Sequence, residues 1–175
     1  MDLRTAKTKS AIHNAYMTLR KKYSPEKIKV VDICQLAQIN KSTFYRHYRD
    51  VFELTQELKV ETFNTFWENF EEKGLMLTQP KRFLISMPKA MDELGEPLLS
   101  AFFRKEIEDL YTLLENALFD YYISDTNSST DNLKITFIIS GILHVFREQH
   151  NTHQYDNSAV AQEVEHIVLS MDLPV

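Results

Sequence analysis

The seven residues from Lys41 to His47 carry side chains that suit contact with a nucleic acid. Cations, hydroxyl groups and aromatic rings with an OH or NH group fill the run, and only Phe44 is purely apolar. Phe44 and Tyr48 are four residues apart, so in a helix they share one face, which we expect to be buried. The other side chains then point outward, toward phosphate oxygens and base edges. They are Lys41, Ser42, Thr43, Tyr45, Arg46 and His47.

Two short helices joined by a tight turn are predicted to position these side chains. Asn40 is placed to cap the second helix, which then begins at Lys41. The first helix is predicted from an apolar stripe at positions i, i+3, i+4 and i+7, formed by Val30, Ile33, Cys34 and Ala37. This pattern is typical of a helix-turn-helix.

The run NKSTFYRHYRDVFEL, preceded by VVDICQLAQI, resembles the DNA-binding head of the TetR family of bacterial transcriptional regulators. The resemblance covers roughly residues 5 to 58, and beyond them it is only architectural. It implies that Ser42, Thr43, Tyr45 and His47 contact DNA, that Lys41 and Arg46 flank them, and that Lys29 binds a phosphate.

Two positions depart from the family pattern. The turn between the two helices has Gln38 where the family usually has glycine, and Val51 stands where the family has a lysine. A residue other than glycine is strained at a turn that needs positive φ, but it is allowed there. Arg49 is a candidate to replace the missing lysine charge from a different angle.

Composition and breaker residues predict an all-α protein. The 175 residues include three glycines and five prolines, and β-type alternation is rare. A first helix is predicted over residues 3–23 and a long helix over residues 50–73, stopped by Gly74. We therefore expect a three-helix DNA-binding head at residues 1–50, joined by a long helix to a helical dimerisation and effector-binding body at residues 51–175. The body is predicted to be broken at Pro80, Pro88, residues 94–97 and the loops 124–132 and 150–158.

Charge is segregated between these two parts. The net charge is −5, but residues 1–60 hold 12 Lys and Arg against 6 Asp and Glu, while residues 61–175 hold 8 against 19. A basic head on an acidic body would orient the molecule toward a polyanion. The alternative is that surface charge is segregated by chance.

The last two predicted helices are the candidate dimer interface. Residues 137–146 are apolar nearly all round a helix, so both sides of that helix must be covered. A four-helix pairing about a two-fold axis would cover it, and TetR-family members usually dimerise in this way. Alternatively, the segment is the central core helix of the body. The predicted interface residues are Phe137, Ile138, Gly141, Ile142, Val145, Val164, Ile167, Val168 and Met171.

The resemblance also implies an effector site in the body, because the family usually binds its small-molecule ligand there. Aromatic side chains could line such a pocket, although aromatics at these spacings are more often part of the core: Phe102, Phe103, Tyr111, Phe119, Tyr121 and Tyr122. The body is short for the family, so a protein partner bound to the acidic body is the alternative.

Enzymatic and membrane functions are not expected. The sequence has no phosphate-binding glycine loop, no metal-ligand spacing and no cofactor motif, and His144 is expected to be a core residue. It has one cysteine, Cys34, no apolar run of membrane-spanning length and no signal peptide, which favours a cytoplasmic protein.

The sequence thus predicts a TetR-like regulator, a repressor that binds double-stranded DNA as a homodimer at a pseudo-palindromic operator and responds to an effector. The alternative is a helix-turn-helix activator or architectural protein that is controlled by a protein partner.

Overall fold

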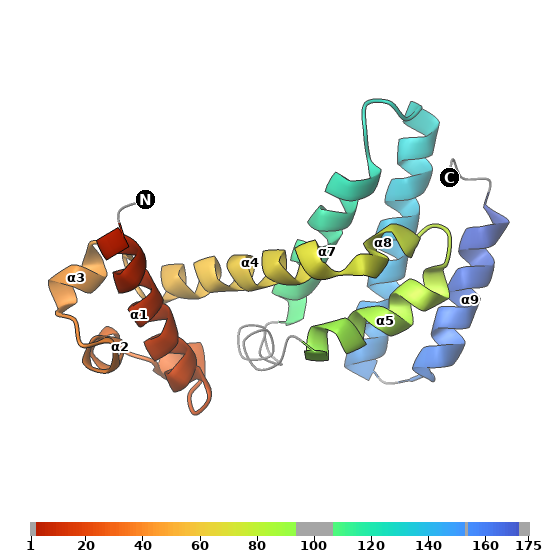
Figure 1. Ribbon diagram of the computed structural model, residues 1–175. Helices are drawn as coiled ribbons and strands as arrows, with labels where there is room; N and C mark the ends of the chain where they lie inside the picture. The colour runs from red at the N-terminus through yellow and green to blue at the C-terminus, as the bar shows by residue number, and fades with distance from the viewer. Residues whose placement is uncertain (1–2, 94–106, 153, 172–175) are drawn as a thin grey trace. The chain divides into compact units, whose positions relative to one another are not determined.

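The computed structural model describes residues 3–93, 107–152 and 154–171 (Figure 1). These residues form helices and connecting turns, and no strand occurs among them. They divide into two compact units, with the boundary in the long helix α4 (Val51–Asn69) between Asn64 and Thr65. The fold is therefore all-α, as the sequence predicts.

The head has its core where three helices meet the first part of α4. It comprises α1 (Leu3–Arg20), the 3₁₀ turn η1 (Pro25–Lys27), α2 (Val30–Ala37) and α3 (Lys41–Tyr45). The core side chains come from every one of these helices, and five of them are fully buried: Ile12, Ile33, Phe44, Leu54 and Tyr16. The predicted first helix was too long at its carboxyl end, since α1 ends at Arg20 rather than at residue 23.

The turn between α2 and α3 has the conformation that normally selects glycine. Gln38 ends α2 with φ 54° and ψ 44°, in the left-handed region. The N–H of Ile39 then donates to the carbonyl of Cys34 at 3.0 Å, which closes the end of the helix. The predicted turn therefore forms despite the missing glycine.

The long helix α4 ends at Asn69, four residues before the predicted end. A 3₁₀ segment, η2 (Glu71–Leu75), follows, so Gly74 lies inside η2 rather than at the stop of the helix. The hydroxyl of Tyr122 fixes this segment, because it donates to the Lys73 carbonyl at 3.0 Å and accepts from the Met76 N–H at 3.1 Å.

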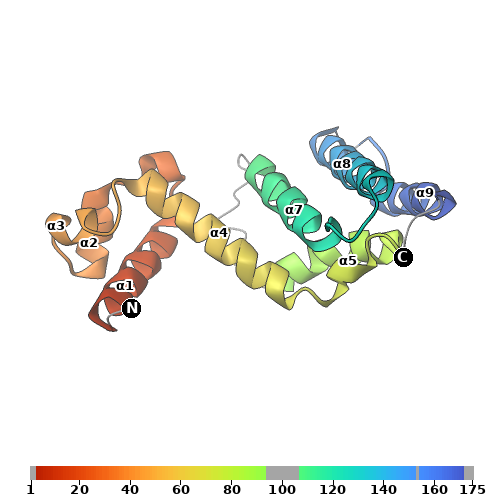
Figure 2. The same ribbon diagram turned by 90° about the horizontal axis from the view of Figure 1, so that it is seen from above.

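The described body contains four further helices: α5 (Pro80–Glu93), α7 (Ile107–Tyr122), α8 (Ser129–Thr152) and α9 (Asn157–Ser170). Helix α5 packs on α9 and on η2, α7 packs on α8, and α8 lies beside α9 (Figure 2). Crossing a bilayer would need a longer apolar run than any helix in these described ranges offers.

Three predicted breaks in the body were wrong in detail. Pro88 lies inside α5, although a proline removes one helical hydrogen bond, because packing on η2 and α9 outweighs that loss. Helix α8 begins at Ser129 inside the polar run, since the Ser128 hydroxyl accepts from the Asp131 N–H at 3.1 Å and caps the helix. At its other end α8 continues to Thr152, and Asp156 caps α9.

Candidate DNA-binding interface

One side chain organises the start of α3. The Asn40 side-chain oxygen accepts from the Thr43 N–H at 2.7 Å, which makes Asn40 the N-cap, as its sequence position predicts. The same oxygen also accepts from the hydroxyl groups of Ser42 and Thr43, each at 2.8 Å. A single amide oxygen therefore holds both hydroxyl groups of the helix.

The bonds from the Ser42 and Thr43 hydroxyl groups to Asn40 determine whether these groups donate to DNA or accept from it. A hydroxyl has one hydrogen, so Ser42 and Thr43, which already donate to Asn40, present oxygen lone pairs to the outside. Lone pairs can accept from the amino groups of adenine or cytosine, whereas phosphate oxygens need a donor. In this arrangement the two hydroxyl groups suit base edges better than phosphates.

The faces of α3 divide as the sequence predicts. Phe44 and Tyr48 are buried, with 0% and 2% of their surface exposed. Thr43 and His47 are half-buried, and the remaining predicted DNA-binding side chains are exposed: Lys29, Lys41, Ser42, Tyr45, Arg46 and Arg49. The helix itself is shorter than predicted, because it ends at Tyr45 and a turn carries the chain on to Tyr48.

His47 lies in that turn, with its N–H bonded to the Phe44 carbonyl at 2.8 Å. Partial burial lowers the pKa of its imidazole below the ordinary value, and the positive charges of Arg46 and Lys9 lower it further. A lowered pKa means that the ring is mostly neutral at pH 7. In the free protein His47 therefore offers one N–H donor rather than a full positive charge.

The start of α4 is acidic. The Asp50 side chain accepts from the Glu53 N–H at 2.8 Å, and the Glu53 carboxylate accepts from the Arg49 N–H at 2.6 Å and from its guanidinium at 3.3 Å. A phosphate would have to compete with Glu53 for Arg49. The start of α4 thus has Val51 where the TetR family has a lysine, and it also carries the two carboxylates of Asp50 and Glu53.

A polar network behind α3 holds Tyr48 in place. Tyr48 donates to Glu57 of α4 at 2.5 Å, and Glu57 also pairs with Lys9 of α1 at 2.9 Å. Burial and the nearby Glu57 carboxylate both raise the pKa of the Tyr48 hydroxyl, so it stays protonated. The turn that follows α3 is therefore tied to both α1 and α4.

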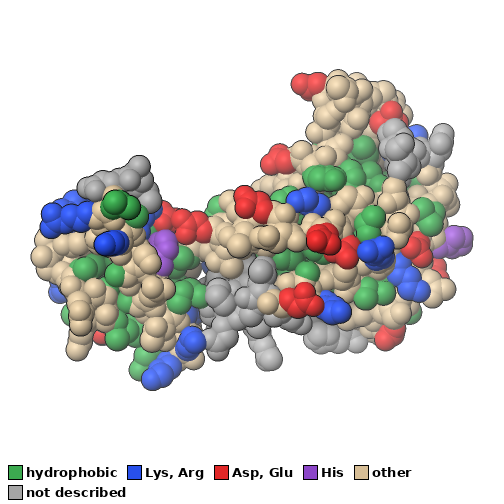
Figure 3. Space-filling view, viewed as in Figure 1, with side chains coloured by type: hydrophobic (Ala, Val, Ile, Leu, Met, Phe, Trp, Pro, Cys, Tyr) green, Lys and Arg blue, Asp and Glu red, His purple; other side chains and the backbone are tan. Residues whose placement is uncertain are grey.

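Lys and Arg side chains are visible in several separate places on the head and on the body (Figure 3). The exposed cations of α3 and the following turn belong to the basic part of the chain.

Comparison of the sequence with models of known families and with curated proteins finds no match. Solved structures do match. A TetR transcriptional regulator from Streptococcus agalactiae 2603V aligns with a TM-score of 0.57 and 20% identity, over 94% of this chain and 95% of that chain. The dihydroxyacetone kinase operon activator DhaS aligns with a TM-score of 0.52 and 18% identity, over 93% and 94%.

This chain has a TetR-like fold. One of these structural neighbours is named a transcriptional regulator and the other an operon activator.

The predicted effector residues of the TetR-like body have varied surroundings. Phe102 and Phe103 lie outside the described residues. Tyr111 is buried, with the Arg147 guanidinium 5.4 Å from its ring centre, and Phe119 is half-buried. The Tyr122 hydroxyl is bonded to the backbone of η2, as described above. An effector role for these side chains stays a prediction.

A groove between α5 and α9 was not predicted from the sequence. It has a volume of about 500 Å³ and is lined by Gln79, Lys81, Arg82, Ile85, Ser86, Lys89 and Glu165. Three of these side chains are cations on one helix of an otherwise acidic body. Lys81, Arg82 and Lys89 lie close together in the sequence, but only the packing of α5 on α9 identifies the groove.

The predicted dimer residues fall on two different faces of α8 and α9. Ile138, Ile142, Val164 and Val168 are buried inside the body, as expected for a core helix. Phe137, Gly141, Val145 and Ile167 are exposed, and Met171 is half-buried. Leu133 was not among the predicted residues; it is 70% exposed and extends the exposed stripe of α8 by one turn. His144, predicted to be a core residue, is exposed.

Proposed function

We propose that this chain is a DNA-binding regulator of transcription that reads a pseudo-palindromic operator as a homodimer. The observation that carries the proposal is the division of α3, where Phe44 and Tyr48 anchor the helix while Lys41, Tyr45 and Arg46 extend into solvent. A buried anchor beneath exposed cations and hydrogen-bonding groups is what a recognition helix needs to enter the major groove. The regulators that share the fold support the same function.

The dimer is supported by the exposed apolar stripe on α8. Leu133, Phe137 and Val145 expose 70%, 68% and 42% of their surfaces. Apart from the chain neighbours of Gly141 and the backbone of its own helix, no described atom lies within 4 Å of where a Cβ of Gly141 would stand. A second copy of the helix could therefore approach closely at Gly141. Two heads related by a two-fold axis would reach half-sites roughly 34–36 Å apart.

Selection of bound sequences from random double-stranded DNA tests the proposal. Wild-type protein is expected to enrich one pseudo-palindrome, while the double variant Tyr45→Ala, His47→Ala enriches nothing. Phe52→Ala removes a 70% exposed aromatic ring outside α3 and serves as the matched control. If the wild-type chain enriches no sequence, autonomous operator binding is wrong.

Repression by a small-molecule effector is the proposed mode of control. An effector changes DNA affinity only if it binds the two arrangements of the heads with different affinity. The groove between α5 and α9 supports an anionic compound, because Lys81 and Lys89 line it together with Arg82, which pairs with Glu72 at 3.6 Å, against the single carboxylate of Glu165. Anionic compounds should then raise the melting temperature of the wild-type chain, and the double variant Lys81→Gln, Lys89→Gln should lose that response.

An activator controlled by a protein partner is the second candidate, and DhaS, an operon activator with this fold, favours it. Charge reversal on the acidic body separates the two candidates. If Glu163→Lys and similar exposed changes abolish regulation in cells while DNA binding in vitro is intact, the partner candidate gains. A reporter gene downstream of the selected operator then gives the sign of regulation.

A further inference from the structure

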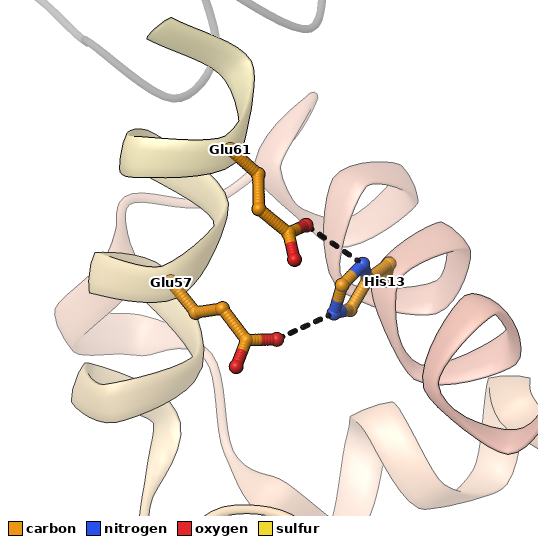
Figure 4. Close-up of side chains that lie close together, drawn as sticks. All are labelled: His13, Glu57 and Glu61. Carbon is orange, nitrogen blue, oxygen red and sulfur yellow. Dashed lines mark ion pairs between the residues drawn. The ribbon is translucent and has the colours of Figure 1, made fainter. Parts of the chain in front are cut away.

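A histidine and two glutamates converge between α1 and α4 in the head (Figure 4). Glu57 and Glu61 are one helical turn apart on α4, so both face α1, where His13 lies. Glu57 lies 3.3 Å from Nε2 of His13, and Glu61 lies 3.7 Å from Nδ1. The three residues offer one ligand atom each, all within 4.8 Å of one another.

Hydrogen bonding at Tyr48 places a hydrogen on Nε2 of His13. A carboxylate only accepts, so the Tyr48 hydroxyl donates to Glu57, 2.5 Å away. The hydrogen bonds of Tyr48 and Lys9 outweigh the effect of burial and lower the pKa of Glu57, which keeps it ionised. The Tyr48 oxygen must then accept from Nε2 of His13, 2.7 Å away.

In the neutral ring, the hydrogen on Nε2 leaves the lone pair of Nδ1 directed toward the Glu61 carboxylate, whereas in the protonated ring the same contact is an ion pair. Two electron-rich atoms 3.7 Å apart are well spaced to hold a small cation between them. Zinc binds imidazole nitrogen at about 2.0–2.1 Å and carboxylate oxygen at about 2.0–2.2 Å, so two such ligands lie about 3–4 Å apart. Hydrogen bonds run from Nε2 of His13 through the Tyr48 hydroxyl to Glu57. Hydrogen bonds of this kind, to the ring nitrogen that does not bind the metal, orient metal-binding histidines.

We propose that His13, Glu57 and Glu61 form a binding site for a divalent transition-metal ion of the Zn²⁺ class. His13 and Glu61 can bind the ion in the present arrangement. Glu57 becomes the third ligand when its carboxylate releases Lys9 and binds the ion instead. Imidazole with carboxylates suits Zn²⁺ and its neighbours in the first transition row, whereas Mg²⁺ prefers sites made of oxygen alone. Solvent reaches the site, because the side chains of Glu57 and Glu61 are 31% and 54% exposed.

Lys9 makes the proposal specific. Its ammonium group lies 2.9 Å from both oxygens of Glu57, so it already neutralises the carboxylate charge that would otherwise attract the metal ion. Removing this ammonium group should strengthen metal binding, although it removes an ion pair of the folded head. If these side chains only stabilised the fold, removing the Lys9 ammonium group would not increase the affinity for metal. An ion bound here would tie α1 to α4 directly beside Tyr48.

Calorimetric titration of the full chain, free of tags and chelators, with ZnCl₂ at pH 7.5 tests the site. One ion per chain is expected to bind. His13→Gln and Glu61→Gln should each weaken binding at least about tenfold, and Lys9→Met should tighten it. MgCl₂ should give no binding. The controls are Glu68→Gln, an exposed carboxylate further along α4, and His166→Gln, an exposed histidine of α9, and both should bind Zn²⁺ like the wild type.

Circular dichroism checks that each variant is folded. Lys9→Met is expected to bind Zn²⁺ more tightly, and unfolding could not produce that gain in affinity. Unchanged affinity in His13→Gln and Glu61→Gln would overturn the proposal, as would weaker binding in Lys9→Met. If Zn²⁺ does not bind to the wild type, the metal site is wrong.

Discussion

At the scale of single residues, Asn40 sets the chemistry that α3 presents. Its side-chain oxygen accepts from the hydroxyl groups of Ser42 and Thr43, so both hydroxyl oxygens face outward as acceptors. The sequence predicted that these residues contact DNA, but it could not distinguish contact with phosphates from contact with bases. The difference depends on where the hydroxyl hydrogens point, and the fold around the N-cap decides that.

Thr43→Val is expected to relax sequence preference at one base pair of each half-site. Valine keeps the shape of threonine and loses the acceptor, so the preferred operator should bind about 5- to 10-fold more weakly, in keeping with about 1–3 kcal/mol per lost base contact. Binding to other sequences should change little. Thr43→Ser is the control, and an equal loss on all sequences would instead mean that Thr43 contacts a phosphate.

His47 should make DNA affinity depend on pH. The pKa of its imidazole is lowered in the free protein, and a nearby phosphate would favour the protonated form. Binding to DNA then takes up a proton, so affinity should rise as the pH falls from about 7.5 to about 6. Fluorescence anisotropy at constant salt measures this trend. His47→Gln should abolish most of the pH dependence, and a variant that retains it would show that another group titrates.

At the scale of elements, the turn after α2 contains a removable strain. Gln38 holds a φ of 54°, which costs residues other than glycine about 1–2 kcal/mol. Gln38→Gly should therefore raise the free energy of unfolding by about 0.5–1 kcal/mol, since the greater freedom of glycine in the unfolded chain offsets part of the gain. Urea denaturation measures the change. Gln38→Ala keeps the strain and should give no gain, so an equal gain there would contradict this explanation.

Tyr122 joins α7 to the segment that follows α4. Burial raises the pKa of its hydroxyl to about 12, and the hydroxyl bonds to the Lys73 carbonyl and the Met76 N–H. Tyr122→Phe should lower the free energy of unfolding by about 1–2 kcal/mol, because it leaves these two backbone groups unpaired. Tyr121→Phe, at a neighbour that is 49% exposed, is the control for thermal or urea unfolding. Equal losses in the two variants would argue against a specific role for the Tyr122 bonds.

Local signals in the sequence predicted the elements of the head well and those of the body less well. The Asn40 cap, the apolar stripe of α2 and the pair Phe44 and Tyr48 act over a few residues, so the pattern shows them directly. The continuation of α5 through Pro88 depends on packing against segments far away in the sequence. The same reason hides the cluster of His13 with Glu57 and Glu61, whose members are 44 and 48 residues apart.

At the scale of the whole molecule, charge is divided between two parts of the chain. The basic head would attract DNA, while the acidic body would be repelled by it. A monomer would place only one head on DNA. The proposed pairing of α8 and α9 is therefore what would turn weak half-site binding into operator recognition, because the second head binds without a new loss of translational freedom.

The double variant Phe137→Glu, Ile167→Glu tests this link between assembly and DNA binding. The two side chains are 68% and 59% exposed, so the change should leave the fold intact while carboxylates oppose each other across the proposed two-fold axis. Light scattering should show a dimer for the wild type and a monomer for the variant. Because a monomer neutralises half as many phosphates, the slope of log affinity against log salt should fall to about half. Ile85→Glu, at a site 53% exposed on α5, should keep both the dimer and the slope. A variant that is monomeric yet binds the full operator like the wild type would show that dimerisation through these helices is not needed for recognition.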